Sequence, residues 1–178
     1  MKPFLEFLAG LSVALVGAYF TARLAQRAAA RERRRQLYGE AYKAALTWKE
    51  LYFRVRRRRN SDDARYKLAD RFHELHENLD FHRGWISTES VALWRSYCGL
   101  VDRVKGDYEP LIQEAWDKAA LRPGKRMPKD ELGGLPDTRA AEKRFLRDVR
   151  WHLSLVPVIP KLWIRRVNRK SRVPDVYR

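Results

Sequence analysis

The stretch FLEFLAGLSVALVGAYFTARL, residues 4–24, contains only two charged side chains, Glu6 and Arg23. As a helix rising 1.5 Å per residue, about 20 residues extend roughly 30 Å, the thickness of a bilayer's hydrocarbon layer. Its apolar side chains lie all round the helix, unlike those of an amphipathic helix in the membrane interface. Glu6 falls in the first turn, where its carboxylate reaches headgroup water. The stretch predicts a transmembrane anchor over residues 1–25.

A cleaved secretory signal is the alternative interpretation of this segment, with Ala28-Ala29-Ala30 as the small-residue cleavage site. Arg23 and Arg27 separate the apolar run from these alanines. Lys2 is the only charged side chain before the apolar run. These flanks favour an uncleaved signal-anchor.

The distribution of cations around the apolar stretch sets its orientation. Only Lys2 and the amino terminus precede the stretch, whereas six arginines follow it: Arg23, Arg27, Arg31, Arg33, Arg34 and Arg35. Loops rich in Lys and Arg stay on the cytoplasmic side. We therefore expect a single-pass protein with its N-terminus outside and its C-terminal domain in the cytoplasm.

Small residues recur at every fourth position of the stretch, at Gly10, Ala14, Ala18 and Ala22. Such a face lets two membrane helices approach closely, which predicts membrane-helix association. The alternative is chance, because glycine and alanine are common in membrane helices.

Composition permits one modest domain beyond the anchor. The 178 residues are 45% hydrophobic and carry a formal net charge of +16, with a sequence pI near 10.4. This charge favours polyanionic partners, namely nucleic acid, anionic lipid or an acidic protein. Cys98 is the only cysteine, so no internal disulfide or cysteine-based zinc site is available, and we expect it in the core.

No proline lies between Thr21 and Arg59, so the first helix is predicted to continue as a juxtamembrane basic helix over residues 26–60. Its apolar residues have heptad spacing, as in a coiled coil: Leu37, Ala41, Ala44, Trp48, Leu51 and Val55. That stripe requires a partner, either a second copy or the helices that follow.

Residues 61–164 are predicted to form a helical bundle, which makes the fold class all-α. One helix is expected over residues 62–82, closed by Gly84, and a central helix is expected after a cap at Ser87 or Thr88. Gly106 and Pro110 are expected to break that central helix, with Pro110 starting a fourth.

Proline and glycine residues predict an exposed loop over residues 122–136. Asp137 or Thr138 is expected to cap a last helix with four inward residues, Phe145, Val149, Leu153 and Val156. Residues 153–164 are apolar but too short to span, so they either pack on the bundle or attach to the membrane surface. Residues 165–178 form a basic C-terminal tail.

One cluster invites a metal or catalytic interpretation: His73, His76, Glu77, Asp80 and His82. His73, His76 and Glu77 have spacings that place them on one helix face, which makes them weak metal candidates. The spacing is one residue short of H-E-x-x-H, however, and histidines at a core edge are common. No phosphate-binding glycine loop or nucleophile elbow is present, so the sequence gives no positive indication of a cofactor or of enzyme activity.

Two arginine runs are candidate contacts for anionic partners. Arg33, Arg34 and Arg35 directly follow the anchor and suit lipid headgroups. The second run, Arg56, Arg57, Arg58 and Arg59, lies too far along the chain for headgroups and would meet nucleic acid or an acidic protein. A simple solvated surface is the alternative for both runs.

The anchor, the juxtamembrane Arg33-Arg34-Arg35-Gln36-Leu37-Tyr38 and the stretches Leu75-His76-Glu77 and His82-Arg83-Gly84-Trp85-Ile86 resemble small bacterial, particularly actinobacterial, membrane-anchored helical proteins without assigned function. The resemblance covers about the first hundred residues. It implies a bacterial inner-membrane protein and no catalytic residues.

Together these patterns predict a membrane-tethered cytoplasmic helical domain that serves as a protein-interaction or scaffolding module and associates with itself or with a protein partner. The alternative is a basic module that binds nucleic acid or anionic lipid at the membrane. A membrane-acting defence effector or enzyme is a third, less favoured hypothesis.

Overall fold

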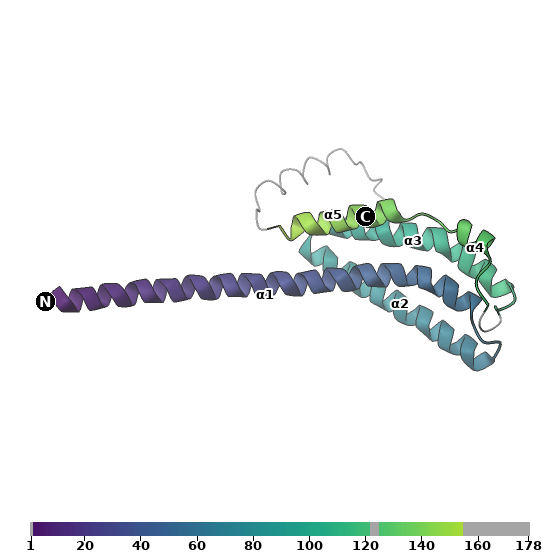
Figure 1. The fold of residues 1–178 in the computed structure, drawn as a ribbon, viewed down its shortest axis with the longest axis horizontal. Coiled ribbons are helices and arrows are strands. Elements are labelled where there is room, and N and C mark those ends of the chain that lie inside the picture. Colours follow the sequence, from purple (N-terminus) through teal and green to yellow (C-terminus); the bar gives the residue numbers. More distant parts are fainter. Residues whose placement is uncertain (1, 122–124, 155–178) are drawn as a thin grey trace. The chain divides into compact units, whose positions relative to one another are not determined.

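The computed structural model describes residues 2–121 and 125–154, with side chains from Ala14 onward. Within these residues all regular structure is helical, which confirms the all-α fold class (Figure 1). The helices are α1 (Lys2–Arg56), α2 (Asp62–Glu89), α3 (Val91–Asp117), α4 (Lys129–Gly133) and α5 (Arg139–His152). The chain divides into two compact units, residues 1–39 and residues 40–178.

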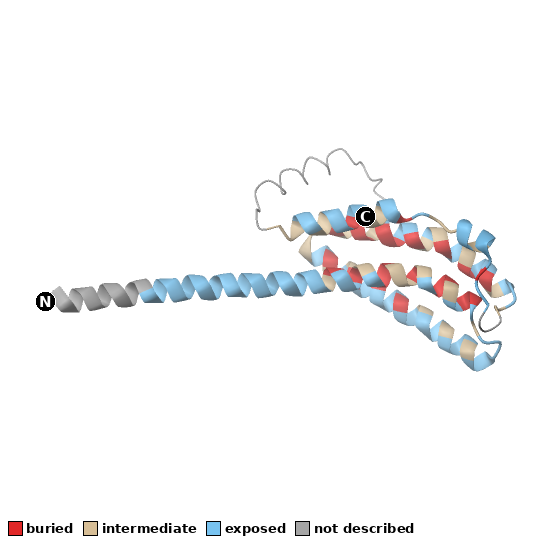
Figure 2. Ribbon diagram, viewed as in Figure 1, coloured by how far each residue is buried: buried red, intermediate tan, exposed pale blue. Residues whose placement is uncertain are grey.

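The first unit is the N-terminal part of α1. Every residue from Ala14 to Gln36 is exposed, and Figure 2 draws the corresponding stretch of α1 in pale blue. The prediction that the first helix continues past Thr21 without a break is confirmed, because α1 is assigned as one helix of 55 residues.

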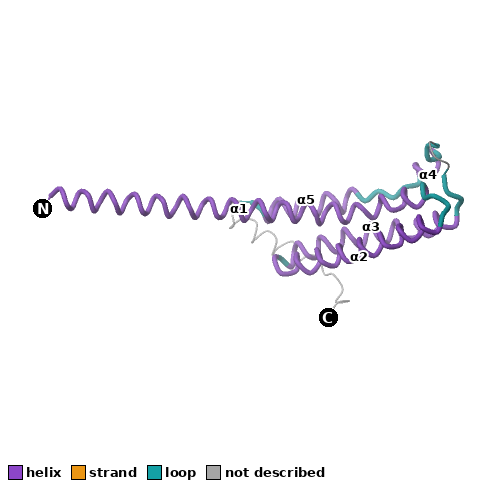
Figure 3. The backbone as a smooth tube through the Cα atoms, turned by 90° about the horizontal axis from the view of Figure 1, so that it is seen from below, coloured by secondary structure: helices purple, strands orange, loops and turns teal. Residues whose placement is uncertain are grey.

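The second unit is a helical bundle in which α3 packs against both α2 and α5 (Figures 1 and 3). The C-terminal part of α1 contributes a stripe of buried side chains at Ala41, Ala44, Ala45, Trp48, Leu51, Tyr52 and Val55. From Ala41 to Val55 the predicted heptad stripe is therefore buried within the bundle, so this part of the stripe does not require a second copy.

The predicted end of α2 at Gly84 is wrong. The helix begins as expected after Ser61, whose hydroxyl accepts a hydrogen bond from the Ala64 N–H, but it runs on to Glu89. A Cβ at Gly84 would meet open space, and the glycine has ordinary helical backbone angles. Burial of Ile86, two residues later, outweighs the small cost of a helical glycine.

One extended residue, Ser90, separates α2 from α3 and caps both. Its N–H bonds to the Ile86 carbonyl at the end of α2, and its hydroxyl accepts a hydrogen bond from the Leu93 N–H of α3. The caps predicted at Ser87 and Thr88 are wrong, because these hydroxyls bond to carbonyls within α2. A serine with β-region angles serves as an N-cap wherever the first turn needs an acceptor.

Helix α3 is the predicted central helix and packs against both α2 and α5, but it does not break at Gly106 or Pro110. Pro110 lies inside the helix, and its flanking residues Tyr108, Ile112 and Ala115 are buried. Packing on both sides of the proline compensates for the hydrogen bond that its ring removes. The separate fourth helix predicted from Pro110 is therefore the second half of α3.

The predicted loop over residues 122–136 contains the single turn of α4, and residues 122–124 lie outside the described part. Helix α5 begins after Thr138, as expected, with Phe145 fully buried and Val149 and Leu153 half-buried. The predictions for Val156, for the rest of residues 155–164 and for the basic tail lie outside the described residues.

Candidate functional site

The N-terminal part of α1 exposes a group of large apolar side chains. Leu15, Val16, Tyr19, Phe20 and Leu24 are between 54% and 63% exposed. Over the residues described with side chains, no helix is long and apolar enough to cross a membrane. The predicted anchor lies only partly in this range, since the side chains of residues 4–13 fall outside it.

Three of the four small residues predicted to mediate helix association, Ala14, Ala18 and Ala22, are exposed on α1. Gly10 lies where side chains are not described. Directly after this segment, Arg31, Arg33, Arg34 and Arg35 are also exposed, and Arg35 lies 3.9 Å from Glu32. An exposed apolar segment followed by exposed cations is therefore one candidate site.

The second arginine run has internal contacts that the sequence did not predict. Arg56 is 5% exposed, and its guanidinium bonds to both carboxylate oxygens of Glu131, Nε to Oε2 at 3.0 Å and Nη2 to Oε1 at 2.8 Å. Its Nη1 donates to the Ala119 carbonyl at 2.8 Å. This bidentate geometry is the strong form of an ion pair, and it lowers the pKa of the Glu131 carboxyl. Arg56 holds α4 and Ala119 against the end of α1 and is not available to an external anion.

Arg58 caps the C-terminal end of α3. Its guanidinium donates to the carbonyls of Ala115, Trp116 and Lys118 at 2.8 to 2.9 Å, and it lies 5.2 Å from the centroid of the Trp116 ring. The last carbonyls of a helix lack intrahelical donors and carry partial negative charge. An arginine there supplies the missing hydrogen-bond donors and a compensating positive charge. Only Arg57 and Arg59 of this run are exposed.

Glu142 on α5 collects polar contacts from α1. Its carboxylate accepts hydrogen bonds from the Tyr42 hydroxyl at 2.8 Å, from the Lys49 ammonium and from the Thr138 hydroxyl at 2.6 Å. Burial by itself raises the pKa of this carboxyl, but the three donors outweigh burial and the net pKa is lowered. Burial and the bond to Glu142 raise the pKa of Tyr42 to about 12. Glu142 therefore joins α1 to α5 as a charged structural contact.

The histidine cluster does not converge. His73, His76, Glu77 and Asp80 are exposed, whereas His82 is buried. His76 lies edge-on against Trp48, with ring centroids 5.0 Å apart, and desolvation followed by the nearby Lys105 charge lowers its pKa. Across the described residues, no three His, Cys, Asp or Glu side chains are placed to hold a metal ion. His76 instead packs at the edge of the core.

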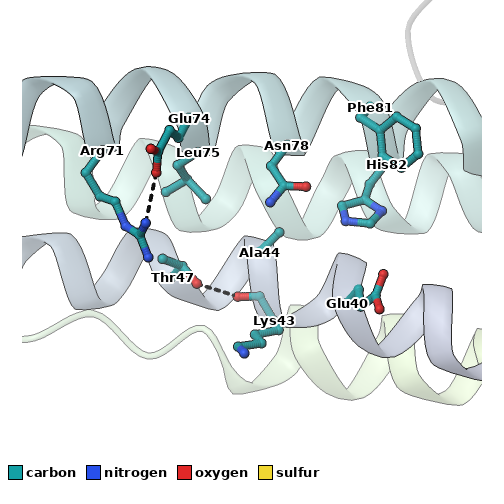
Figure 4. Close-up of a pocket in the computed structure, with 10 residues that line it drawn as sticks. All are labelled: Glu40, Lys43, Ala44, Thr47, Arg71, Glu74, Leu75, Asn78, Phe81 and His82. Carbon is teal, nitrogen blue, oxygen red and sulfur yellow. Dashed lines mark hydrogen bonds and ion pairs between the residues drawn. The ribbon is translucent and has the colours of Figure 1, made fainter.

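A groove of about 370 Å³ lies between α1 and α2 within the bundle (Figure 4). Lys43 and Arg71 line it together with Glu40 and Glu74, and Arg71 pairs with Glu74 at 2.8 Å. Buried His82 also lines it, and burial lowers the pKa of its imidazole against the opposing effect of Glu40. The mixed charges neutralise one another, and none of the lining groups forms a nucleophile–base pair.

Cys98 is half-buried on α3, and burial raises the pKa of its thiol. A raised pKa keeps the sulfur protonated at neutral pH, so it has no nucleophilic activation. Cys98 therefore lies at the edge of the core, and not within it as the sequence had led us to expect.

Sequence reasoning missed the partners Glu131 and Glu142 because they lie 75 and 93 residues from Arg56 and Lys49. No local spacing links residues at such separations. Comparisons with protein-family models, with curated proteins and with solved structures find no match to this chain.

Proposed function

We propose that this chain is a membrane-tethered interaction module, in which residues 4–24 cross a bacterial inner membrane once and hold the basic helical bundle in the cytoplasm. The observation that carries the proposal is the exposure of Leu15, Val16, Tyr19, Phe20 and Leu24 on α1. Burying a large apolar side chain is worth about 1.5–3 kcal/mol. Lipid would supply that burial for side chains that the described residues leave exposed.

The exposed arginines after this segment support the orientation. Residues 25–36 contain five arginines and one acidic residue, Glu32, and all of them are exposed. A cationic segment directly after an apolar helix is retained on the cytoplasmic side. The N-terminus would then lie outside and the bundle inside.

The contents of the bundle are consistent with an interaction role. Its polar clusters at Arg56, Arg58 and Glu142 are satisfied within the chain and carry no catalytic pair. The heptad stripe is covered, so self-association would use the small-residue face of Gly10, Ala14, Ala18 and Ala22 within the membrane. The nucleic-acid hypothesis loses Arg56 and Arg58 as contacts and is the less favoured alternative.

Membrane fractionation tests the anchor. The tagged full chain should stay in the membrane pellet after alkaline carbonate extraction, and the variant with Leu15→Arg and Phe20→Arg should move largely to the soluble fraction. Each arginine at a helix centre costs about 2.5–3.5 kcal/mol in membrane insertion. The matched control is Tyr66→Arg, because Tyr66 on α2 is 73% exposed. Release of the unaltered chain by carbonate would exclude the anchor.

Cysteine accessibility tests the orientation. Arg59→Cys in a Cys98→Ala background places one thiol at an exposed position of the bundle. A membrane-impermeant maleimide should label it only after the inner membrane is disrupted. Labelling in intact spheroplasts would reverse the proposed topology.

A further inference from the structure

The outward face of α5 is strongly cationic. Every basic residue of the helix before its terminal histidine is exposed: Arg139, Lys143, Arg144, Arg147 and Arg150. We refer to these five residues as the α5 basic face. Both acidic residues of the helix, Glu142 and Asp148, are turned inward, with side chains 16% and 25% exposed.

Periodicity explains this separation of charge. Arg139, Lys143, Arg147 and Arg150 follow one another at spacings of four, four and three residues, which places them on one side of a helix. The opposite side carries Phe145, which is fully buried. Packing against α3 therefore fixes which side of α5 faces outward.

Little of the positive charge is neutralised within the described residues. Arg147 lies 3.2 Å from Asp148, and Arg139 lies 4.0 Å from Asp137. No ion pair is found there for Lys143, Arg144 or Arg150. Like charges on adjacent turns repel one another, which favours a multivalent anionic partner.

Two apolar side chains lie among these cations. Leu146 is 41% exposed and Trp151 is 38% exposed. Tryptophan is enriched at the level of lipid headgroups, where its amphipathic ring meets both polar and apolar surroundings. A polynucleotide backbone offers no comparable apolar layer for a leucine. The combination favours lipid over nucleic acid.

We infer that the α5 basic face, together with Leu146 and Trp151, docks onto the anionic headgroups of a lipid bilayer. The inference rests on the proposed function in one respect, because the anchor would keep the bundle at a high local concentration near lipid. Docking would be electrostatic and reversible, since a charged helix face near anionic lipid is attracted only within a Debye length. It is distinct from the anchor, which is apolar.

A fluorescent reporter on the full chain tests this inference. A solvatochromic maleimide is attached to Leu146→Cys in a Cys98→Ala background, and the chain is reconstituted in nanodiscs of phosphatidylcholine, with or without phosphatidylglycerol. The emission should shift to the blue only in discs with phosphatidylglycerol, and high salt should reverse the shift. A reporter at Tyr66→Cys on α2 is the control and should not respond.

A charge-neutralised variant makes the test specific for α5. Lys143→Gln, Arg147→Gln and Arg150→Gln together should lower the docking equilibrium constant roughly 100-fold. The control variant removes the same charge from exposed positions on and beside α1, through Arg54→Gln, Arg57→Gln and Arg59→Gln. It should change the docking equilibrium constant little. Equal losses in both variants would overturn the α5 assignment in favour of a nonspecific effect of total charge.

The outcomes separate this inference from the anchor. A chain that stays in phosphatidylcholine discs without any reporter shift in phosphatidylglycerol discs overturns the docking inference alone. A chain that leaves phosphatidylcholine discs overturns the anchor. Docking is then measured by flotation with vesicles that contain phosphatidylglycerol, and a chain that does not float overturns the docking inference. A reporter shift with duplex DNA that exceeds the shift with lipid would overturn the choice of lipid.

Discussion

The two parts of α1 have similar residues and opposite environments. Both carry a run of apolar side chains followed by a run of arginines. In the N-terminal part, Tyr19, Phe20 and Leu24 are exposed, whereas in the C-terminal part Trp48, Leu51 and Val55 are almost completely buried. Local composition therefore does not decide burial. Within residues 14–121 and 125–154, the difference is that the side chains of the second part are covered by other helices of the bundle.

The arginines differ in the same way. The side chain of Arg35 is 75% exposed and lies 3.9 Å from a glutamate on its own helix, while the side chain of Arg56 is 6% exposed and pairs with a glutamate 75 residues away. An exposed pair of the first kind contributes little, and loss of a partner from a buried pair is costly. The comparison predicts that equivalent substitutions in the two parts have very different effects on the bundle.

Truncation of aromatic residues should give the largest difference. Trp48→Ala removes a side chain that contacts Phe72, His76 and Lys105, and we expect the free energy of unfolding to fall by about 4 kcal/mol. Tyr19→Ala should change it by less than about 0.5 kcal/mol. Urea unfolding of the full chain in mild detergent, followed by circular dichroism, measures both. Similar losses would mean that both parts of α1 belong to one core.

Removal of one arginine should give the next largest difference. Arg56→Ala leaves Glu131 without its bidentate partner, and we expect a loss of about 3 kcal/mol in the same unfolding measurement. Arg35→Ala should cost less than about 0.5 kcal/mol. Replacing both partners, with Arg56→Met and Glu131→Leu, should recover most of the loss. No recovery would show that the Ala119 carbonyl contact, and not the ion pair, carries the stability.

The pH dependence of stability should reveal Glu142. Its pKa in the folded chain is lowered below the ordinary 4.5, so the folded state binds fewer protons than the unfolded state in that range. The stability that ionised Glu142 contributes is therefore complete above the pKa of its carboxyl in the unfolded chain. It is lost as the pH falls through the pKa of the carboxyl in the folded chain.

Glu142→Gln should cost about 1–3 kcal/mol at neutral pH and flatten the acid limb of the stability curve. Glu32→Gln on the N-terminal part of α1 is the control, because Glu32 is exposed, and it should leave the curve unchanged. A curve that keeps its acid limb in the Glu142 variant would assign the limb to other carboxyls.

The smallest expected effect concerns the small-residue face. Ala14→Leu with Ala18→Leu should weaken self-association in vesicles by about 1 kcal/mol, or roughly fivefold. Val16→Leu, on the opposite side of the same turns, should leave it unchanged. Energy transfer between donor-labelled and acceptor-labelled chains measures the association. Equal values for all three proteins would exclude this face as the contact.

Much of the fold could be predicted because it follows from local rules. The start of α2 at residue 62, the uninterrupted first helix and the central helix α3 all have periodic or positional signals. The helix ends predicted at Gly84 and Pro110 are wrong because tertiary packing outweighs weak helix propensity there. Propensity describes an isolated helix, whereas burial of Ile86 and Ile112 depends on neighbouring helices.

The candidate sites were less predictable. The exposed apolar segment and the first arginine run could be found from the sequence, but the internal roles of Arg56 and Arg58 could not, because their partners are 57 to 75 residues away. The α5 basic face did have a local signal in its spacing of four, four and three. The cations of this face are separated by other residues along the chain, so they do not form a contiguous run of the kind that marks Arg33–Arg35 and Arg56–Arg59.

The contact between Tyr42 and Glu142 also affects the order in which the bundle can form during synthesis. The two residues are 100 positions apart, and a ribosome adds about 5–20 residues per second. Once Tyr42 has been synthesised, its partner follows only after roughly 5–20 seconds. During that interval the apolar stripe of α1 has no completed bundle to cover it. A nascent chain would thus present the stripe to chaperones, or to a neighbouring nascent copy, before α5 is made.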